Sequence, residues 1–462
     1  MKSALKTILV LALLGAAAAG LVVTLRTGEA PVVEIRPERP GIGPRTPVVV
    51  AVSSPGRGLA EVRLELVQGD RTHVLAERRH RPAPPWSFGR DGVERDEIGA
   101  DVGSETVPGL RAGEARLRVT ATRAPTWLLR PEPVVAELAL PVRLVPPELS
   151  LLSAHHYVAQ GGAGVVVYRA GESSIRDGVR AGEWFFPGAP LEGFGPADRF
   201  ALFGVPWDLE DDVGIRLVAE DDVGNVAELA FVDRFFPKPP ARDQIRLEDS
   251  FMSRVVPEIM SRTPELADRG DLLENYLQLN RELRRHNASA LVELARGSAP
   301  RFLWSEPFLP LRNAKVMSSF ADQRTYLHAG REVDRQVHLG YDLAVVARTP
   351  VPAANRGVVR MARYFGIYGN SVVVDHGHGL MTLYSHLSSM DVSEGDEVER
   401  GAIVGRTGAT GLAGGDHLHF TTLVGGLPVN PTEWWDAAWI RDRVAGKLGP
   451  ALRFAETGGD GS

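Results

Sequence analysis

Short apolar segments separated by Gly- and Pro-rich stretches dominate the first half of the chain. Between Pro31 and Val145, apolar and polar positions alternate in TPVVVAVSS, AEVRLELVQ, EARLRVTATRA and VVAELALPVRLV. A period of two is typical of strands that bury one face. Several short strands at this spacing predict a β-sandwich, which we expect to be immunoglobulin-like, over residues 31–145.

A second strand-rich unit is expected over residues 146–237, where GGAGVVVYRA, DRFALFGVPWD and GIRLVAED are the clearest strands. The segment AEDDVGNVAELAF resembles the last hairpin of bacterial immunoglobulin-like modules, which implies a second sandwich of that kind.

The pentapeptide EDDVG occurs at residues 210–214 and again at 220–224. It is either a calcium site or a pair of turns that flank one strand, and we favour the turns.

The apolar period changes to that of a helix between residues 243 and 300. In DLLENYLQLNRELRRHNASALVELARG the large apolar side chains fall mainly on one helical face. Asp271 can cap the start of this helix and Gly297 its end, while Pro257 and Pro264 are expected to divide the preceding segment into shorter helices. We expect a linker or brace here; a lid that holds a site inactive is the alternative.

Strand patterns and glycine turns return in the last part of the chain, from about Phe308 to Trp435. We place an antiparallel β domain at residues 301–440 and a tail at residues 441–462. The predicted fold class is therefore mainly β and multidomain, with two sandwiches, a short helical segment and a C-terminal antiparallel domain.

Residues 1–27 have the pattern of an export or anchoring signal. Lys2 and Lys6 precede an uncharged apolar run from Thr7 to Leu25, which is just long enough to span a bilayer as a helix. We favour a signal anchor in the inner membrane, and a signal peptide cleaved near GAAAAG is the alternative. Both place the remainder of the chain outside the cytoplasm. A buried globular helix is a third interpretation.

Composition excludes several classes of function. A chain of 462 residues predicts more than one domain. The net charge of -6 gives no electrostatic case for binding nucleic acid, which requires a basic surface. The absence of cysteine excludes a thiol nucleophile, a cysteine zinc site and a disulfide.

Histidines gather in the C-terminal region, where most of the twelve lie between His328 and His419. Zinc binds imidazole nitrogen and carboxylate oxygen, and a catalytic site has three protein ligands and one open position. In GGDHLHF, two histidines one residue apart would share one face of a strand. Spacing alone does not choose the ligands among the candidates, which are His338, Asp342, His376, His378, His386, His417 and His419.

Residues 308–435 resemble the lysostaphin-type zinc metallopeptidase family. The segments HLGYDLA, YGNSVVVDHGHGLMTLYSHLS, VSEGDEVERGAIVGRTGATG, GGDHLHF and VNPTEWW match the family's motifs in order. The resemblance implies that His338, Asp342 and His419 bind Zn²⁺ and that His386 and His417 are catalytic. His376 matches a frequent family position that is neither a ligand nor a base.

One position departs from the family pattern. Ala321 stands where glycine is common after the phenylalanine of SSFADQRTY. We interpret this difference as a variation of a turn without consequence for catalysis.

The resemblance implies a zinc-dependent endopeptidase that hydrolyses the peptide cross-links of bacterial peptidoglycan during cell-wall remodelling. Its expected partners are peptidoglycan stem peptides, the inner membrane through the N-terminal segment, and other envelope proteins. The expected location is the cell envelope, either anchored and facing the periplasm or exported. The main alternative is a non-catalytic envelope protein that binds and activates wall amidases, and the complete set of site residues disfavours it. A third hypothesis is an adhesin or scaffold in which residues 31–240 are the functional part.

Overall fold

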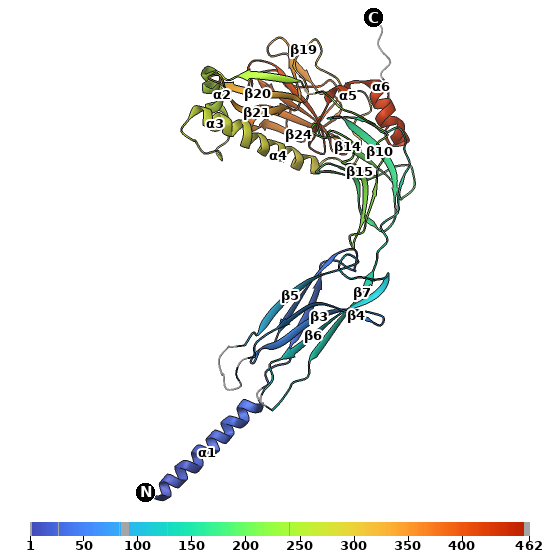
Figure 1. Ribbon diagram of the computed structural model, residues 1–462. Coiled ribbons are helices and arrows are strands. Elements are labelled where there is room, and N and C mark those ends of the chain that lie inside the picture. Colours follow the sequence, from blue (N-terminus) through green and yellow to red (C-terminus); the bar gives the residue numbers. More distant parts are fainter. Residues whose placement is uncertain are drawn as a thin grey trace. The chain divides into compact units, whose positions relative to one another are not determined.

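The computed structural model describes residues 2–25, 27–82, 84, 92–126, 128–239 and 241–456. The chain divides into two compact units. The first consists of residues 1–147, 173–175 and 220–227, and the second of residues 148–172, 176–219 and 228–462. Strands dominate both units and most pair antiparallel, so the mainly β class predicted from the alternation is confirmed (Figure 1).

The chain begins with helix α1 (Lys2–Leu25). Residues Ala4–Val23 are long and apolar enough to cross a membrane, and none of this stretch is buried by other parts of the described structure. A membrane anchor and a signal peptide share these properties, so the two interpretations of the N-terminus both remain.

Two sheets form the first unit, with strand orders β1-β2-β5 and β4-β3-β6-β7. Buried and half-buried positions alternate along the whole of β2. Side chains from both sheets share one core, which includes Val50, Leu64 and Leu117. This is the two-layer arrangement that the alternation predicts, and its immunoglobulin-like character stays a prediction. The strands are β1 (Val32–Pro37), β2 (Thr46–Ser53), β3 (Leu59–Gln68), β4 (Arg71–Arg79), β5 (Arg95–Val102), β6 (Gly113–Arg123) and β7 (Val134–Val142).

Both copies of EDDVG form turns. In the first copy the Asp211 carboxylate accepts a hydrogen bond from the Val213 amide, and in the second Asp221 accepts from the amides of Val223 and Asn225. These are the local bonds by which aspartate closes a turn. The turn interpretation is therefore confirmed.

The strands predicted for residues 146–237 form two four-stranded sheets, ordered β13-β14-β10-β8 and β12-β11-β15-β16, and a parallel pair β17-β9. Their core continues into that of the C-terminal region without a break: Val165, Phe203, Trp304 and Trp434 belong to one cluster. The boundaries predicted within residues 146–440 stay a prediction. The strands are β8 (Leu149–Leu151), β9 (Tyr157–Ala159), β10 (Ala163–Ala170), β11 (Ser174–Ala181), β12 (Trp184–Pro187), β13 (Ala189–Pro190), β14 (Asp198–Gly204), β15 (Ile215–Asp221), β16 (Val226–Leu229) and β17 (Arg234–Phe236).

The helical segment contains α2 (Asp249–Ser261), α3 (Leu272–Gln278), a π-helical turn η1 (Leu279–Leu283) and α4 (Arg284–Arg296). Asp271 caps α3 as predicted, since its side chain accepts a hydrogen bond from the Glu274 amide. The prediction that Pro257 divides the first helix is wrong, because α2 continues past it. Packing of the buried face of α2, which includes Val255 and Ile259, offsets the hydrogen bond that Pro257 cannot donate.

The C-terminal region is built around an eight-stranded sheet with the order β19-β22-β30-β26-β25-β24-β28, in which β31 pairs with β30. The same region contains two smaller sheets, β18-β20-β21 and β23-β29-β27. The strands are β18 (Arg242–Arg246), β19 (Lys315–Ser318), β20 (Asp322–His328), β21 (Arg331–His338), β22 (Tyr341–Ala344), β23 (Pro350–Pro352), β24 (Gly357–Tyr364), β25 (Asn370–Gly377), β26 (Leu380–Ser385), β27 (Ser389–Met390), β28 (Glu397–Val398), β29 (Ile403–Arg406), β30 (Leu418–Val424) and β31 (Leu427–Val429).

Alternation along β30 assigns its side chains to the two faces of this sheet. Leu418 and Phe420 enter the large core shared with the preceding strands. Leu423, on the opposite face, packs with Leu291 of α4, which crosses that face (Figure 1). His419 and Thr421 have the parity of Leu423, so they lie on the face that the helical segment covers in part.

After the sheet, the chain forms α5 (Pro431–Trp435), α6 (Ala437–Ile440), η3 (Arg441–Ala445), α7 (Gly446–Leu448) and η4 (Gly449–Ala451). Val444, Leu448 and Leu452 are buried in the large core. The first part of the predicted tail is therefore ordered by apolar packing, and residues 457–462 of that tail lie outside the described residues.

Ala321 adopts a left-handed backbone conformation with φ of 68°, and its amide donates a hydrogen bond to the carbonyl of His338. Glycine is common at this position in the lysostaphin-type family, and it adopts the left-handed conformation without the steric cost that a Cβ brings.

Replacing Ala321 tests this explanation. Ala321→Gly should raise the free energy of unfolding of the second unit by about 1 kcal/mol, measured by urea denaturation. Ala344→Gly in β22, where φ is not positive, is the matched control and should lower it. An Ala321→Gly protein less stable than the wild type would contradict this explanation.

Candidate metal centre

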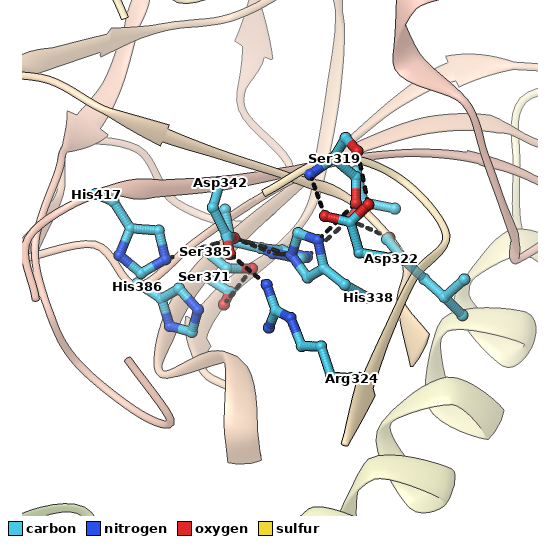
Figure 2. A network of polar contacts seen from close by, with 12 residues as sticks. Ser319, Asp322, Arg324, His338, Asp342, Ser371, Ser385, His386 and His417 are labelled. Atoms are coloured by element: carbon cyan, nitrogen blue, oxygen red, sulfur yellow. Dashed lines mark hydrogen bonds and ion pairs between the residues drawn. The ribbon is translucent and has the colours of Figure 1, made fainter. Parts of the chain in front are cut away.

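Three polar side chains meet at one end of the eight-stranded sheet, and strand register brings them together. His338 is the last residue of β21. Asp342, in β22, lies directly opposite His419 in β30. Ser385 of β26 lies opposite His419 on its other side. Asp342 and His419 therefore come from adjacent strands of the eight-stranded sheet, and His338 comes from the neighbouring sheet β18-β20-β21. Figure 2 shows His338 and Asp342 pointing toward one another.

The ligand-type atoms of these side chains are in mutual contact. Nε2 of His338 lies 3.0 Å from Oδ1 of Asp342 and 3.0 Å from Nδ1 of His419. Nδ1 of His419 lies 2.9 Å from the same carboxylate oxygen. In the part of the chain that the structure describes, this is the one group of three or more His, Asp or Glu residues arranged to hold a metal ion.

In His338 and His419, the ring nitrogen that points away from the cluster donates a hydrogen bond. Nδ1 of His338 lies 3.0 Å from the carbonyl oxygen of Ser319, which can only accept. Nε2 of His419 lies 3.0 Å from the hydroxyl of Thr421, which donates its own proton to the Leu339 carbonyl. In the neutral rings, Nε2 of His338 and Nδ1 of His419 are therefore unprotonated. Two lone pairs and a carboxylate oxygen face one another.

Such a triangle of acceptors is favoured by a cation bound among them. Burial lowers the pKa of His419 to about 4, with contacts to Asp342 opposing the shift, so a proton on this ring is disfavoured. Zinc bound at about 2.0–2.1 Å to tetrahedral ligands separates the ligand atoms by about 3.3 Å. The observed separations of 2.9–3.0 Å lie within a few tenths of an ångström of that value. The donor set of two imidazoles and one carboxylate thus fits zinc.

Arg324 holds the second oxygen of the carboxylate. Its guanidinium donates to Oδ2 of Asp342 at 2.9 Å, which leaves Oδ1 to face the two imidazoles. Burial opposes the ionisation of Asp342, but contacts with His338, His417 and His419 outweigh burial and hold the pKa of this carboxyl well below its usual range. The carboxylate is therefore charged, and its Oδ1 is held toward the two imidazoles.

A second set of contacts orients His338. The carboxylate of Asp322 accepts hydrogen bonds from the amide and the hydroxyl of Ser319, at 2.8 and 2.7 Å. Asp322 also lies opposite His338 in the β20–β21 register. Asp322 therefore fixes the carbonyl that selects the tautomer of His338, which is the usual task of groups behind metal ligands.

His386 and His417 lie beside the centre (Figure 2). Their ring centroids are 4.9 Å apart, and Nε2 of His417 is 3.5 Å from Oδ1 of Asp342. Each ring is held through Nδ1, by the carbonyl of Thr410 for His386 and by that of Gly415 for His417. Each therefore keeps Nε2 available, as an acceptor when neutral and as a donor when protonated.

Burial, with further contributions from His417 and His419, holds the pKa of His386 well below its usual range. Burial also opposes protonation of His417, but Asp342 outweighs it and raises the pKa of that ring. The two neighbouring imidazoles thus differ in their tendency to carry a proton, as a pair with divided tasks requires.

The other two candidate histidines lie elsewhere. His376 is fully buried, with Nδ1 2.7 Å from the Arg356 carbonyl and Nε2 2.8 Å from the Thr382 hydroxyl. His378 packs edge-on against Phe200 and close to Phe302. Both side chains are used in packing and do not join the centre.

Three residues with contacts to the centre, Arg324, Asp322 and Thr421, were not among the candidates predicted from the sequence. Thr421 continues the period-two pattern of His417 and His419, so its position on the same strand face was readable. Arg324 and Asp322 follow Ser319 in SSFADQRTY, but their contact with the HLGYDLA segment depends on the pairing of β20 with β21.

A buried His–Asp–His cluster with two further histidines beside it defines the class of metal-dependent hydrolase sites. Comparison with known proteins points to one family: residues 336–431 match Peptidase family M23.

Relatives in this region include the DD-carboxypeptidase/endopeptidase Mpg of Neisseria meningitidis serogroup B, 38% identical over 26% of this chain and 27% of that protein. The peptidoglycan DD-endopeptidase ShyA of Vibrio cholerae is 45% identical over 20% of this chain and 22% of that protein. The match thus spans about a quarter of the length of these relatives. Among solved structures, the catalytic domain of lysostaphin from Staphylococcus simulans is 27% identical and covers 27% of this chain and 92% of its own, with a TM-score of 0.23.

Replacing Arg324 tests the role of its contact with Asp342. Arg324→Gln should weaken zinc affinity about tenfold, because the carboxylate loses the partner that orients it. Competition with a chromogenic chelator measures this, and a thermal melt confirms folding. Arg331→Gln, an exposed change on the same hairpin, is the control. Equal zinc affinity in Arg324→Gln and the control would show that the contact does not support the centre.

Proposed function

We propose that this chain is a zinc-dependent endopeptidase that hydrolyses peptide cross-links of bacterial peptidoglycan. The observation that carries the proposal is the meeting of two imidazole nitrogens and one carboxylate oxygen at 2.9–3.0 Å. In this proposal His338, Asp342 and His419 bind the ion, and His386 and His417 are catalytic. The match to Peptidase family M23 and the names of the relatives support the substrate class.

Zinc held by these ligands would make an attacking water acidic near neutral pH and polarise the scissile carbonyl. The protein supplies the proton transfers. His417 keeps Nε2 beside the carboxylate of Asp342, at 3.5 Å, and can accept a proton from the water.

His386 approaches from the adjacent strand end and can stabilise the negative oxygen of the reacting carbonyl in its protonated form. Burial disfavours that form in the protein alone. Negative charge developing on the substrate favours it, so the interaction strengthens toward the transition state.

The bond class follows from the same proposal. One relative is named a DD-carboxypeptidase/endopeptidase and the other a peptidoglycan DD-endopeptidase, and we propose that this chain cleaves the corresponding cross-link bond. Helix α1 supports a location in the cell envelope, as an anchor or as an export signal. The two strand-rich regions before the helices would then carry the catalytic domain and meet wall or envelope partners. The complete donor set disfavours the alternative of a non-catalytic amidase activator.

Replacing His419 and His417 one at a time tests metal binding and proton transfer separately. His419→Ala should lose stoichiometric zinc, because a ligand is removed. His417→Ala should keep zinc and lose turnover on purified sacculi by about 10²–10⁴-fold, because the proton acceptor is removed. Zinc content and fragment release are measured on both proteins, with His286→Ala, an exposed change on α4, as the control. A His419→Ala protein with full zinc and full activity would refute the assignment.

Fragments released from sacculi of known composition identify the bond. Mass analysis should show products of cleavage at the cross-link between stem peptides, with the glycan chains intact. A zinc-loaded wild-type protein that releases nothing from sacculi, but increases fragment release by an added amidase, would favour the activator alternative instead.

A further inference from the structure

His386 has a backbone conformation that its own strand does not impose. Its φ is 63°, in the left-handed region that is costly for a residue with a side chain. It follows directly after β26, where regular pairing ends. A residue in this backbone conformation needs contacts with neighbouring residues to stabilise it.

Two loops hold His386, one at the main chain and one at the ring. The His386 amide donates to the Tyr368 carbonyl at 2.9 Å. Its Nδ1–H donates to the Thr410 carbonyl at 2.9 Å. We call residues 365–370 the first loop and residues 410–413 the second loop.

The two loops are bonded to each other. The Leu412 amide donates to the Ile367 carbonyl at 2.8 Å, and the Asn370 amide donates to the Thr410 hydroxyl at 3.0 Å. Gly411 allows the close approach, since a Cβ there would lie 2.4 Å from the Gly369 nitrogen. The loops are therefore linked directly to each other, and both bond to His386.

The helical segment holds the two loops in place. Asn287 of α4, which is 3% exposed, accepts a hydrogen bond from the Ile367 amide at 3.2 Å. Gly366 makes room for it, because a Cβ there would lie 2.5 Å from the Asn287 oxygen. Arg254 of α2 donates to the Ala413 carbonyl at 3.0 Å.

Apolar packing accompanies these bonds. Ile367 is buried in a cluster with Val255 and Val256 of α2 and with Leu279 and Leu283 of the π-helical turn. The helices thus contact both loops through side chains that no other described role requires.

We propose that Asn287 and Arg254 are positioning residues, through which the helical segment sets the location of His386 beside the metal centre. Asn287 and Arg254 act through the two loops on His386, whereas Asn280 and Arg281 of the same segment bond to Asp334 of β21, the strand that ends at His338.

The three candidate ligands have direct hydrogen bonds of their own, to Ser319, Arg324 and Thr421. We therefore expect replacement of Asn287 or Arg254 to displace His386 and to leave zinc binding near the wild-type level. The consequence for catalysis rests on the function proposed above, whereas the effect on the loops does not.

The test compares Asn287→Ala with Asn275→Ala in the full chain. Both asparagines are buried in the same helical segment, but Asn275 bonds to the Arg269 amide and the Asp268 carboxylate and touches neither loop. Hydrogen exchange of residues 365–370 and 410–413 should quicken on the order of tenfold in Asn287→Ala and stay at the wild-type rate in Asn275→Ala.

Kinetics and metal content give the second readout. Asn287→Ala should lower kcat on sacculi on the order of tenfold, with KM and zinc content near those of the wild type. Arg254 is exposed, so Arg254→Met should fold even if Asn287→Ala does not, and Arg254→Lys should restore part of the rate by restoring a donor.

The outcomes are distinct. Unchanged exchange in both Asn287→Ala and Arg254→Met overturns the proposal, whether or not the chain is a peptidase. Faster exchange with unchanged kcat also overturns it, as does loss of zinc, which would mean that the helices support the ligands instead. Faster exchange in a protein whose wild type does not cleave sacculi upholds the positioning of His386 and refutes the proposed function alone.

Discussion

The mutual approach of two imidazole nitrogens and one carboxylate oxygen is the constraint on which this structure depends. At 2.9–3.0 Å, three acceptors without a proton between them repel one another unless a cation lies among them. The surrounding bonds maintain this arrangement. Ser319 and Thr421 commit the outer nitrogens as donors, and Arg324 commits the outer carboxylate oxygen. These bonds leave three acceptors facing one another, which is the arrangement that a bound cation would favour.

The antiparallel sheet supplies the rigidity that such a cluster needs. Asp342 and His419 are register partners, so a slip of one residue between β22 and β30 would remove one of them from the face. The opposite face of β30 is locked by Leu418 and Phe420 in the large core. Apolar burial on one side of the sheet therefore fixes the geometry of the polar cluster on the other.

The histidines beside the centre have a different kind of support. His417 follows the parity of β30, but His386 lies past the end of its strand in a costly conformation. Its location depends on two loops and on the helices behind them. The His338–Asp342–His419 cluster and the neighbouring His386 are therefore held by different sets of contacts. The helical segment, expected as a linker or brace, is in contact with the loops that hold His386.

Period-two alternation was sufficient to determine the mainly β class, the two-layer first unit and the shared face of His417 and His419, because side-chain direction in a strand follows from position alone. The turn chemistry of EDDVG and the cap at Asp271 were also readable, since those bonds join neighbours in sequence. The choice of candidate ligands came from family resemblance, since spacing left every combination open. The tertiary structure alone decided that α2 continues through Pro257, that Arg324 reaches Asp342, and that Asn287 and Arg254 hold the loops around His386. Each of these features depends on contacts between segments far apart in sequence. A local sequence pattern does not show which distant residues will supply those contacts.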